Sequence, residues 1–129
     1  MYIKIVNLYY LKKSGDLLNQ YGTDRDKIDA NYNLMYYCID NKKWEEAIFY
    51  ASESEKYVEL TNNKKVRLQY LKVYKVQCYT ELNKFDIANK LVDLIKIEDD
   101  IKNKDYTLLR FYYKIKSELF EKQKMYKLA

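Results

Sequence analysis

The chain has 129 residues, of which 48% are hydrophobic and 33% are charged, and its net charge is +5 at pH 7. It contains no histidine, no proline and only two glycines. Without histidine the commonest general base and metal ligand is missing, and the scarcity of glycine argues against a phosphate-binding loop. Long helices form without glycine or proline, whereas the tight turns of β-rich folds usually need them. The composition therefore predicts an all-α protein with no catalytic residues.

The cysteines and the apolar segments bear on the compartment. Cys38 and Cys78 are the only cysteines, and each lies in an apolar helical run. With no histidine and no second cysteine nearby, we expect buried free thiols rather than a disulfide or a metal site. The first residues lack the features of a secretory signal, and no segment reaches the roughly 20 apolar residues of a membrane span. We therefore expect a cytoplasmic protein with no membrane contact and no cofactor.

The spacing of hydrophobic residues predicts six helices. The first covers residues 2–21 and places Ile3 and Val6 on one face. Thr23 is a good N-cap for the second helix, over residues 24–41, because its hydroxyl can accept a hydrogen bond from a first-turn N–H group. The fourth helix is apolar on more than one side, which predicts a central helix that is covered twice. The third to sixth helices are expected at residues 43–61, 63–82, 84–102 and 105–127.

A short motif recurs with a period of 41 residues. In each copy an aromatic residue stands three positions before an alanine. A cysteine or a second aromatic residue stands nine positions before the same alanine. Self-similarity at such a period is typical of stacked helical hairpins. The turn of each hairpin is expected to contain a left-handed residue at or beside Asn41 and Asn83. The three copies are Cys38, Trp44 and Ala47; Tyr79, Phe85 and Ala88; and Phe120, Tyr126 and Ala129.

These residues resemble the tetratricopeptide repeat, and Leu82-Asn83-Lys84-Phe85-Asp86-Ile87-Ala88 is the nearest match. The resemblance implies antiparallel helical hairpins stacked as a right-handed solenoid of about six helices. The chain departs from the family at the first-helix Trp and Gly positions, which hold Asn31 and Met35 in the first hairpin. Its period also exceeds the usual 34 residues by about two helical turns. The implied single domain, residues 1–129, consists of a half-hairpin (1–22), two hairpins (23–62 and 63–103) and a terminal helix (104–129).

In this family the first helix of each hairpin lines a concave surface, so the resemblance also assigns binding residues. Asn33 and Gln77 would offer donors and acceptors to the backbone of an extended peptide, and Asp29 and Glu81 would favour a basic peptide. The tyrosines could supply contact area to that peptide or could pack one hairpin against the next, and both interpretations stay open. The expected peptide-binding residues are Asp29, Tyr32, Asn33, Tyr36, Tyr70, Tyr74, Gln77, Glu81, Phe111, Lys114 and Glu118.

The expected function is a non-enzymatic scaffold that binds a peptide or protein segment. Its long hairpins, rich in tyrosine and asparagine, are similar to the sensor half of cytosolic peptide-pheromone regulators of Gram-positive bacteria, which implies a peptide-sensing role. The alternative is a structural assembly domain. The last helix carries more apolar residues than packing on one side can hide, which predicts a homodimer through this C-terminal helix or a chain that is part of a longer protein.

Two charged stretches are candidate sites. The acidic cluster Glu98-Asp99-Asp100 lacks the turn glycine and the alternating ligands of a calcium loop, so we expect a solvated helix end and no metal. Nucleic-acid binding is a weaker alternative, because basic residues at irregular spacing usually form a solvated face, although Tyr70 and Tyr74 are interleaved for stacking. The basic residues concerned are Lys64, Lys65, Arg67, Lys72 and Lys75.

Overall fold

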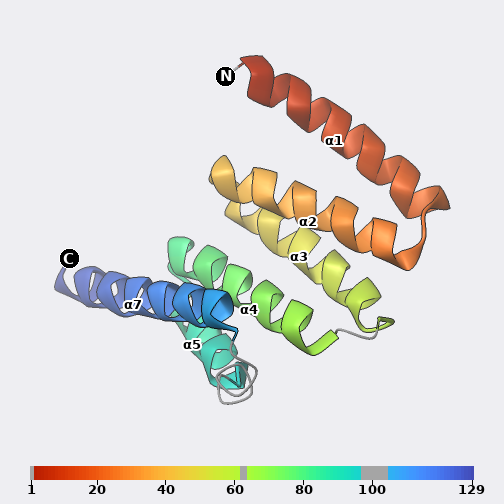
Figure 1. Cartoon of the computed structure of the whole chain (residues 1–129). Helices are drawn as coiled ribbons and strands as arrows, with labels where there is room; N and C mark the ends of the chain where they lie inside the picture. Colours follow the sequence, from red (N-terminus) through yellow and green to blue (C-terminus); the bar gives the residue numbers. More distant parts are fainter. Residues whose placement is uncertain (1, 62–63, 97–104) are drawn as a thin grey trace. The chain divides into compact units, whose positions relative to one another are not determined.

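The computed structural model describes the backbone of residues 2–61, 64–96 and 105–129, and the side chains from residue 9 onward within these ranges except that of Lys64. The described residues form six helices and no strand, so the predicted all-α class is confirmed (Figure 1). The chain divides into two compact units, Met1–Lys64 and Lys65–Ala129. The helices are α1 (Tyr2–Tyr21), α2 (Asp24–Asp40), α3 (Trp44–Val58), α4 (Lys64–Glu81), α5 (Phe85–Leu94) and α7 (Tyr106–Leu128).

Five helices begin and end within three residues of their predicted bounds, but α5 is shorter than predicted. It ends at Leu94, and Ile95 already has an extended backbone, with φ −83° and ψ 119°. Two contacts with the rest of the unit favour this end. Ile95 remains buried in the core after the helix stops, and the side-chain amide of Gln69 donates to the carbonyl oxygen of Lys96 at 3.0 Å. Residues 97–102, the rest of the predicted helix, lie outside the described residues, as does the acidic cluster at 98–100.

The two hairpin turns have the same backbone geometry, and equivalent residues are 41 positions apart. Lys42 and Asn83 adopt left-handed conformations, with φ 58° and φ 59°. Each turn carries the pair of backbone hydrogen bonds that defines a Schellman motif. The bonds run from Lys43 to Cys38 (2.8 Å) and from Lys42 to Ile39 (3.1 Å), and then from Lys84 to Tyr79 (2.9 Å) and from Asn83 to Thr80 (3.0 Å). The predicted left-handed residue is thus confirmed, at Asn83 itself and at the neighbour of Asn41.

Two of the three repeated alanines are buried at the starts of helices. Ala47 and Ala88 are fully buried near the starts of α3 and α5, and the aromatic residues that begin these helices are half-buried beside the turns. The third copy is different. Tyr126 lies inside α7, which continues without interruption to Leu128. Gln and Lys at the corresponding turn positions are good helix formers, so the sequence there does not oppose the continued helix.

In the first unit, α2 packs between α1 and α3. Gly15 is buried, and a Cβ atom built on it would stand only 3.0 Å from Cδ1 of Leu34, so this glycine permits a close approach of α1 to α2. On the other side, the Ser54 hydroxyl of α3 donates to the Ile28 carbonyl oxygen at 3.1 Å. Thr23 forms the predicted N-cap of α2, in a capping box with Asp26. The fully buried side chains of this unit include Ile28, Met35, Cys38, Ala47 and Val58.

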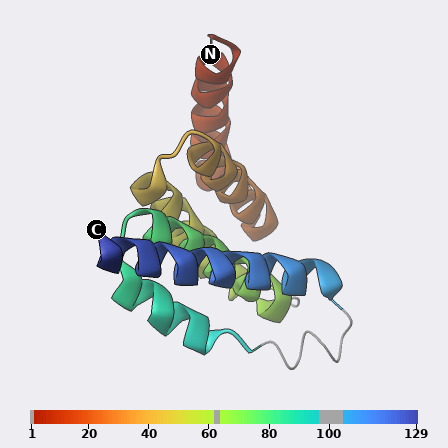
Figure 2. The same ribbon diagram turned by 90° about the vertical axis from the view of Figure 1, so that its left-hand side faces the viewer.

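In the second unit, α4, α5 and α7 share one hydrophobic core. Helix α7 lies alongside α5 in the opposite direction (Figure 2), with the Phe85 and Tyr126 rings 5.4 Å apart at one end. It lies alongside α4 in the same direction, because the contacts Tyr70–Phe111 and Glu81–Lys122 each join residues 41 positions apart. The buried residues of this core are Val73, Val76, Ala88, Ile95, Leu108, Tyr112, Ile115 and Leu119.

Candidate functional site

Four predicted binding residues share one exposed face of α2. Asp29, Asn33 and Tyr36 are exposed and Tyr32 is half-buried. Their spacing of three and four residues places them in one row along the helix. The Tyr32 and Tyr36 rings lie 5.3 Å apart at an angle of 53°. The structure therefore brings these four residues together on the side of α2 that carries none of its fully buried residues.

Three predicted aromatic residues meet between α4 and α7. The Phe111 ring lies 4.6 Å from that of Tyr74 and 6.5 Å from that of Tyr70, with which it is stacked at 25°. Tyr70 and Phe111 also pack against the hydrophobic core of the unit. All three side chains are half-buried, so each still presents some surface. For these three residues, helix packing is therefore observed.

The polar binding residues predicted in the second unit differ in exposure and in pairing. Glu81 accepts a hydrogen bond from Nζ of Lys122 at 2.7 Å in a half-buried ion pair. The pairing reduces the negative charge that Glu81 could offer a basic peptide. Gln77 is half-buried, and Lys114 and Glu118 are exposed on α7. Lys122 was not predicted as a site residue, although its position one period after Glu81 is a signal that could have indicated the pair.

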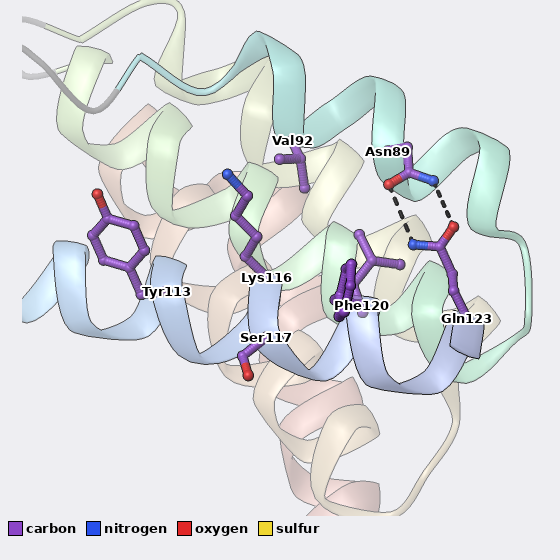
Figure 3. A pocket seen from close by; sticks show the side chains of 8 residues that line it. Asn89, Val92, Tyr113, Lys116, Ser117, Phe120 and Gln123 are labelled. Atoms are coloured by element: carbon purple, nitrogen blue, oxygen red, sulfur yellow. Dashed lines mark hydrogen bonds between the residues drawn. The ribbon is translucent and has the colours of Figure 1, made fainter. Parts of the chain in front are cut away.

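A pocket between α5 and α7 was not predicted. Its volume is about 400 Å³, and Figure 3 shows Val92 and Asn89 on α5 facing residues of α7. At one end the amides of Asn89 and Gln123 exchange hydrogen bonds of 3.0 and 3.5 Å. The remaining lining residues, all on α7, are Tyr113, Lys116, Ser117, Leu119 and Phe120. The aromatic residues Tyr113 and Phe120, seven positions apart, are the sequence signal that could have indicated this face.

A second pocket, of about 320 Å³, lies in the first unit and has a mixed charge. Asn31 forms part of its wall and is almost fully buried; its amide nitrogen donates to the Lys27 carbonyl at 2.8 Å and lies 3.5 Å from the Asn19 side-chain oxygen. Burial raises the pKa of Tyr50 in the same wall, with smaller contributions from Cys38, Glu46 and Asp16. The other lining residues are Lys12, Leu34, Phe49 and Glu53.

The remaining predicted features are the basic run and the two cysteines. Lys65 is exposed, and Arg67, Lys72 and Lys75 are half-buried, so the described part of the basic run is not a uniformly exposed stripe. Cys38 and Cys78 are buried, and neither forms a disulfide. Burial, followed by the charge of Glu46, raises the pKa of the Cys38 thiol, which disfavours the nucleophilic thiolate. Among the residues that the structure describes, no cluster of three or more metal-ligating side chains is found.

The described residues define an all-helical protein with two turns of the same backbone geometry and a pocket in each unit. Comparison of the chain with protein-family models, curated proteins and solved structures found no match. Within the described ranges, no helix has both the length and the apolar character needed to cross a membrane.

Proposed function

We propose that the chain is a non-enzymatic scaffold that binds a peptide or protein segment, with its hairpins stacked as in a tetratricopeptide-like right-handed solenoid. The observation that carries the proposal is the relation between α4 and α7. Contacts at both ends of this pair join residues that are one period of 41 apart. First helices of successive hairpins lie side by side in the same direction in a stacked array. The recurrence of one turn geometry at Lys42 and Asn83 supports the same architecture.

The proposed peptide-binding surfaces are the exposed face of α2 and the shared face of α4 and α7. Asn33 on α2 is exposed, and Gln77 lies on α4 in the neighbourhood of the aromatic cluster. Amide side chains can satisfy both the donors and the acceptors of an extended peptide backbone, while half-buried aromatic rings supply rigid contact area. The proposal includes the peptide-sensing role implied by the resemblance and a cytoplasmic location, in which both thiols would stay reduced.

A selection experiment tests this proposal without a known partner. A random 12-residue peptide library displayed on phage would be enriched on the immobilised full chain, and the enriched peptides would then be titrated against variants. We expect Asn33→Ala or Gln77→Ala to raise the Kd about fivefold or more, because each removes a hydrogen-bonding amide worth ~1 kcal/mol. Gln20→Ala, which removes an exposed amide from α1, is the matched control. Failure to enrich any peptide, or equal binding to all three variants, would reject the proposed surfaces.

Self-assembly through α7 is the second candidate function. It is favoured by the exposed aromatic residues of that helix, because Tyr113 is 50% exposed and Phe120 is 71% exposed. Large exposed apolar patches are uncommon on soluble monomers. Light scattering over a concentration series tests this candidate: a homodimer through α7 predicts a mass that doubles with concentration, and a constant monomer mass contradicts it.

A further inference from the structure

Helix α3 covers one face of α2, and this pair can be compared with the corresponding face of α7. Ile28, Asn31, Met35 and Cys38 form a row on α2, and each is at most 1% exposed. Two contacts place α3 over this row: Ser54 donates to the Ile28 carbonyl at 3.1 Å, and Sγ of Cys38 lies 4.0 Å from Oε2 of Glu46. Helix α3 meets α2 through a stripe of mostly small residues. The buried residues of that stripe are Ala47, Ala51, Ser54 and Val58.

Helix α7 presents the corresponding row to solvent. The positions two periods, or 82 residues, after the covered row of α2 are Arg110, Tyr113, Ser117 and Phe120, which we call the outer row of α7. All four are exposed, and Phe120, the counterpart of the fully buried Cys38, is 71% exposed. The core residues of α7 lie on its other side, against α4 and α5. The outer row therefore corresponds to a helix-packing face, and no described residue of the second unit covers it.

The charge around the outer row decides which kind of helix fits. Arg110, Lys116 and Lys124 are exposed along this side of α7, against a single carboxylate, Glu121. Two copies of a face with this positive charge would repel each other, whereas an acidic helix would be attracted. Helix α3 itself is acidic. Its carboxylates are Glu45, Glu46, Glu53 and Glu55, against one lysine, Lys56.

We propose that the outer row of α7 docks an acidic amphipathic helix of a partner protein, in the position that α3 takes on α2. The docked helix presents small residues at the spacing of the α3 stripe, because small side chains allow two helices to approach closely. Its larger apolar side chains enter the pocket of about 400 Å³ between α5 and α7. Figure 3 shows Phe120 beside that pocket and the Asn89–Gln123 amide pair closing one end. Acidic residues on its flank pair with Arg110 and Lys116.

The α3 sequence itself supplies the probe. A fluorescein-labelled peptide of residues 43–60 would be stapled between positions 45 and 49, which are exposed on α3, because a free peptide of this length is only marginally helical. Fluorescence anisotropy with the full chain should then show saturable binding. Phe120→Asp should weaken this binding by at least about tenfold, since it places a carboxylate at the centre of the apolar contact. Leu94→Asp, which alters another exposed apolar residue of the same unit, is the matched control and should leave binding unchanged.

A charge exchange tests the orientation of the docked helix. Arg110 corresponds to Ile28, whose carbonyl contacts Ser54, so Arg110 should lie near positions 53 and 55 of the peptide. Arg110→Glu should weaken binding several-fold, and a peptide with Glu53→Lys and Glu55→Lys should bind this variant more tightly than it binds the unaltered chain. Equal binding of both peptides to both chains would overturn the proposed charge pairing.

The remaining outcomes also decide the proposal. Absence of saturable binding overturns it, as does binding that is unchanged in Phe120→Asp. A dimer that Phe120→Asp abolishes, seen by light scattering without binding of the peptide, would assign the outer row to a second copy of the chain and overturn the acidic partner. Phe120 is mostly exposed, and circular dichroism of the variant should confirm an unchanged helix content. The peptide-binding surfaces proposed above involve Asn33 and Gln77, so either proposal can fail without the other.

Discussion

Cys38 is fully buried in the last turn of α2, with its sulfur 4.0 Å from a carboxylate oxygen of Glu46. Burial and then this carboxylate raise the pKa of the thiol above its ordinary value of 9.0, while Lys43 and Lys12 act weakly in the opposite direction. The unfolded chain therefore loses this proton at a lower pH than the folded chain. Well below pH 9 the thiol is protonated in both states, and its contribution to folding stability is lost progressively as the pH approaches and passes that value.

We accordingly expect the free energy of unfolding to fall between pH 8.5 and 9.5, and to fall less in Cys38→Ala. Urea unfolding at several pH values measures this difference in slope. The window ends below the ordinary pKa of 10.0 of Tyr50, whose own pKa is also raised, so that Tyr50 stays mostly protonated within it. An identical slope in both proteins would mean that Cys38 ionises as readily in the folded chain as in the unfolded chain.

Individual residues differed in how far the sequence could predict them. Asn83 was predictable because asparagine is enriched in the left-handed region, whereas Lys42 has no such preference and is left-handed because its turn has the same hydrogen bonds. Spacing could not decide whether Tyr70 and Tyr74 bind or pack, since both roles place them on the same face. Their contacts with Phe111 depend on the neighbouring helix, which spacing within one helix does not describe.

At the scale of elements, helix existence was predictable and one helix end was not. Apolar periodicity continues through Ile95 toward Ile101, which predicted a helix to residue 102. The helix instead ends at Leu94, where Gln69 of α4 satisfies a carbonyl beyond the helix end and Ile95 keeps its burial. Both causes are contacts with other elements, so the local pattern could not contain them. The third copy of the motif likewise lies in a helix, because no hairpin turn forms there.

Glycine at the same position of the three motif copies should stabilise the protein in two copies and destabilise it in the third. Lys42→Gly should stabilise the protein by about 1 kcal/mol, because a residue with a Cβ atom is strained at φ 58°. Asn83→Gly should give a smaller gain, since asparagine tolerates this conformation better. Lys124→Gly, at the corresponding position inside α7, should destabilise by up to about 1 kcal/mol through the low helix propensity of glycine.

Thermal unfolding of the three variants measures whether each substitution stabilises or destabilises the protein. Lys43→Gly is the control for the left-handed strain alone, because Lys43, the N-cap of α3, has φ −93° and carries no such strain for glycine to relieve. A lower melting temperature for Lys42→Gly would show that the left-handed turn is absent from the protein in solution.

At the scale of the whole molecule, the period predicted which helices are neighbours inside each unit. Helices α2 and α3 form one hairpin, and α4 and α5 are joined by a turn of the same geometry. Each unit has buried residues of its own, with Ala47 among those of the first unit and Ala88 among those of the second. In repeat proteins a hairpin contacts mainly its neighbours along the chain, so a local change should act locally. This gives a test of how independently the two units unfold.

Ala47→Leu and Ala88→Leu form a reciprocal pair for that test. Each alanine is fully buried at a helix contact, so leucine should overpack the site and cost about 1–3 kcal/mol of stability. We expect Ala47→Leu to accelerate amide hydrogen exchange chiefly in α2 and α3, and Ala88→Leu chiefly in α4, α5 and α7. Glu45→Leu and Asp86→Leu add the same side chain at exposed positions of α3 and α5, and should leave exchange almost unchanged. If either alanine variant instead accelerates exchange equally in both units, the chain unfolds as one cooperative block and the repeats are not energetically separate.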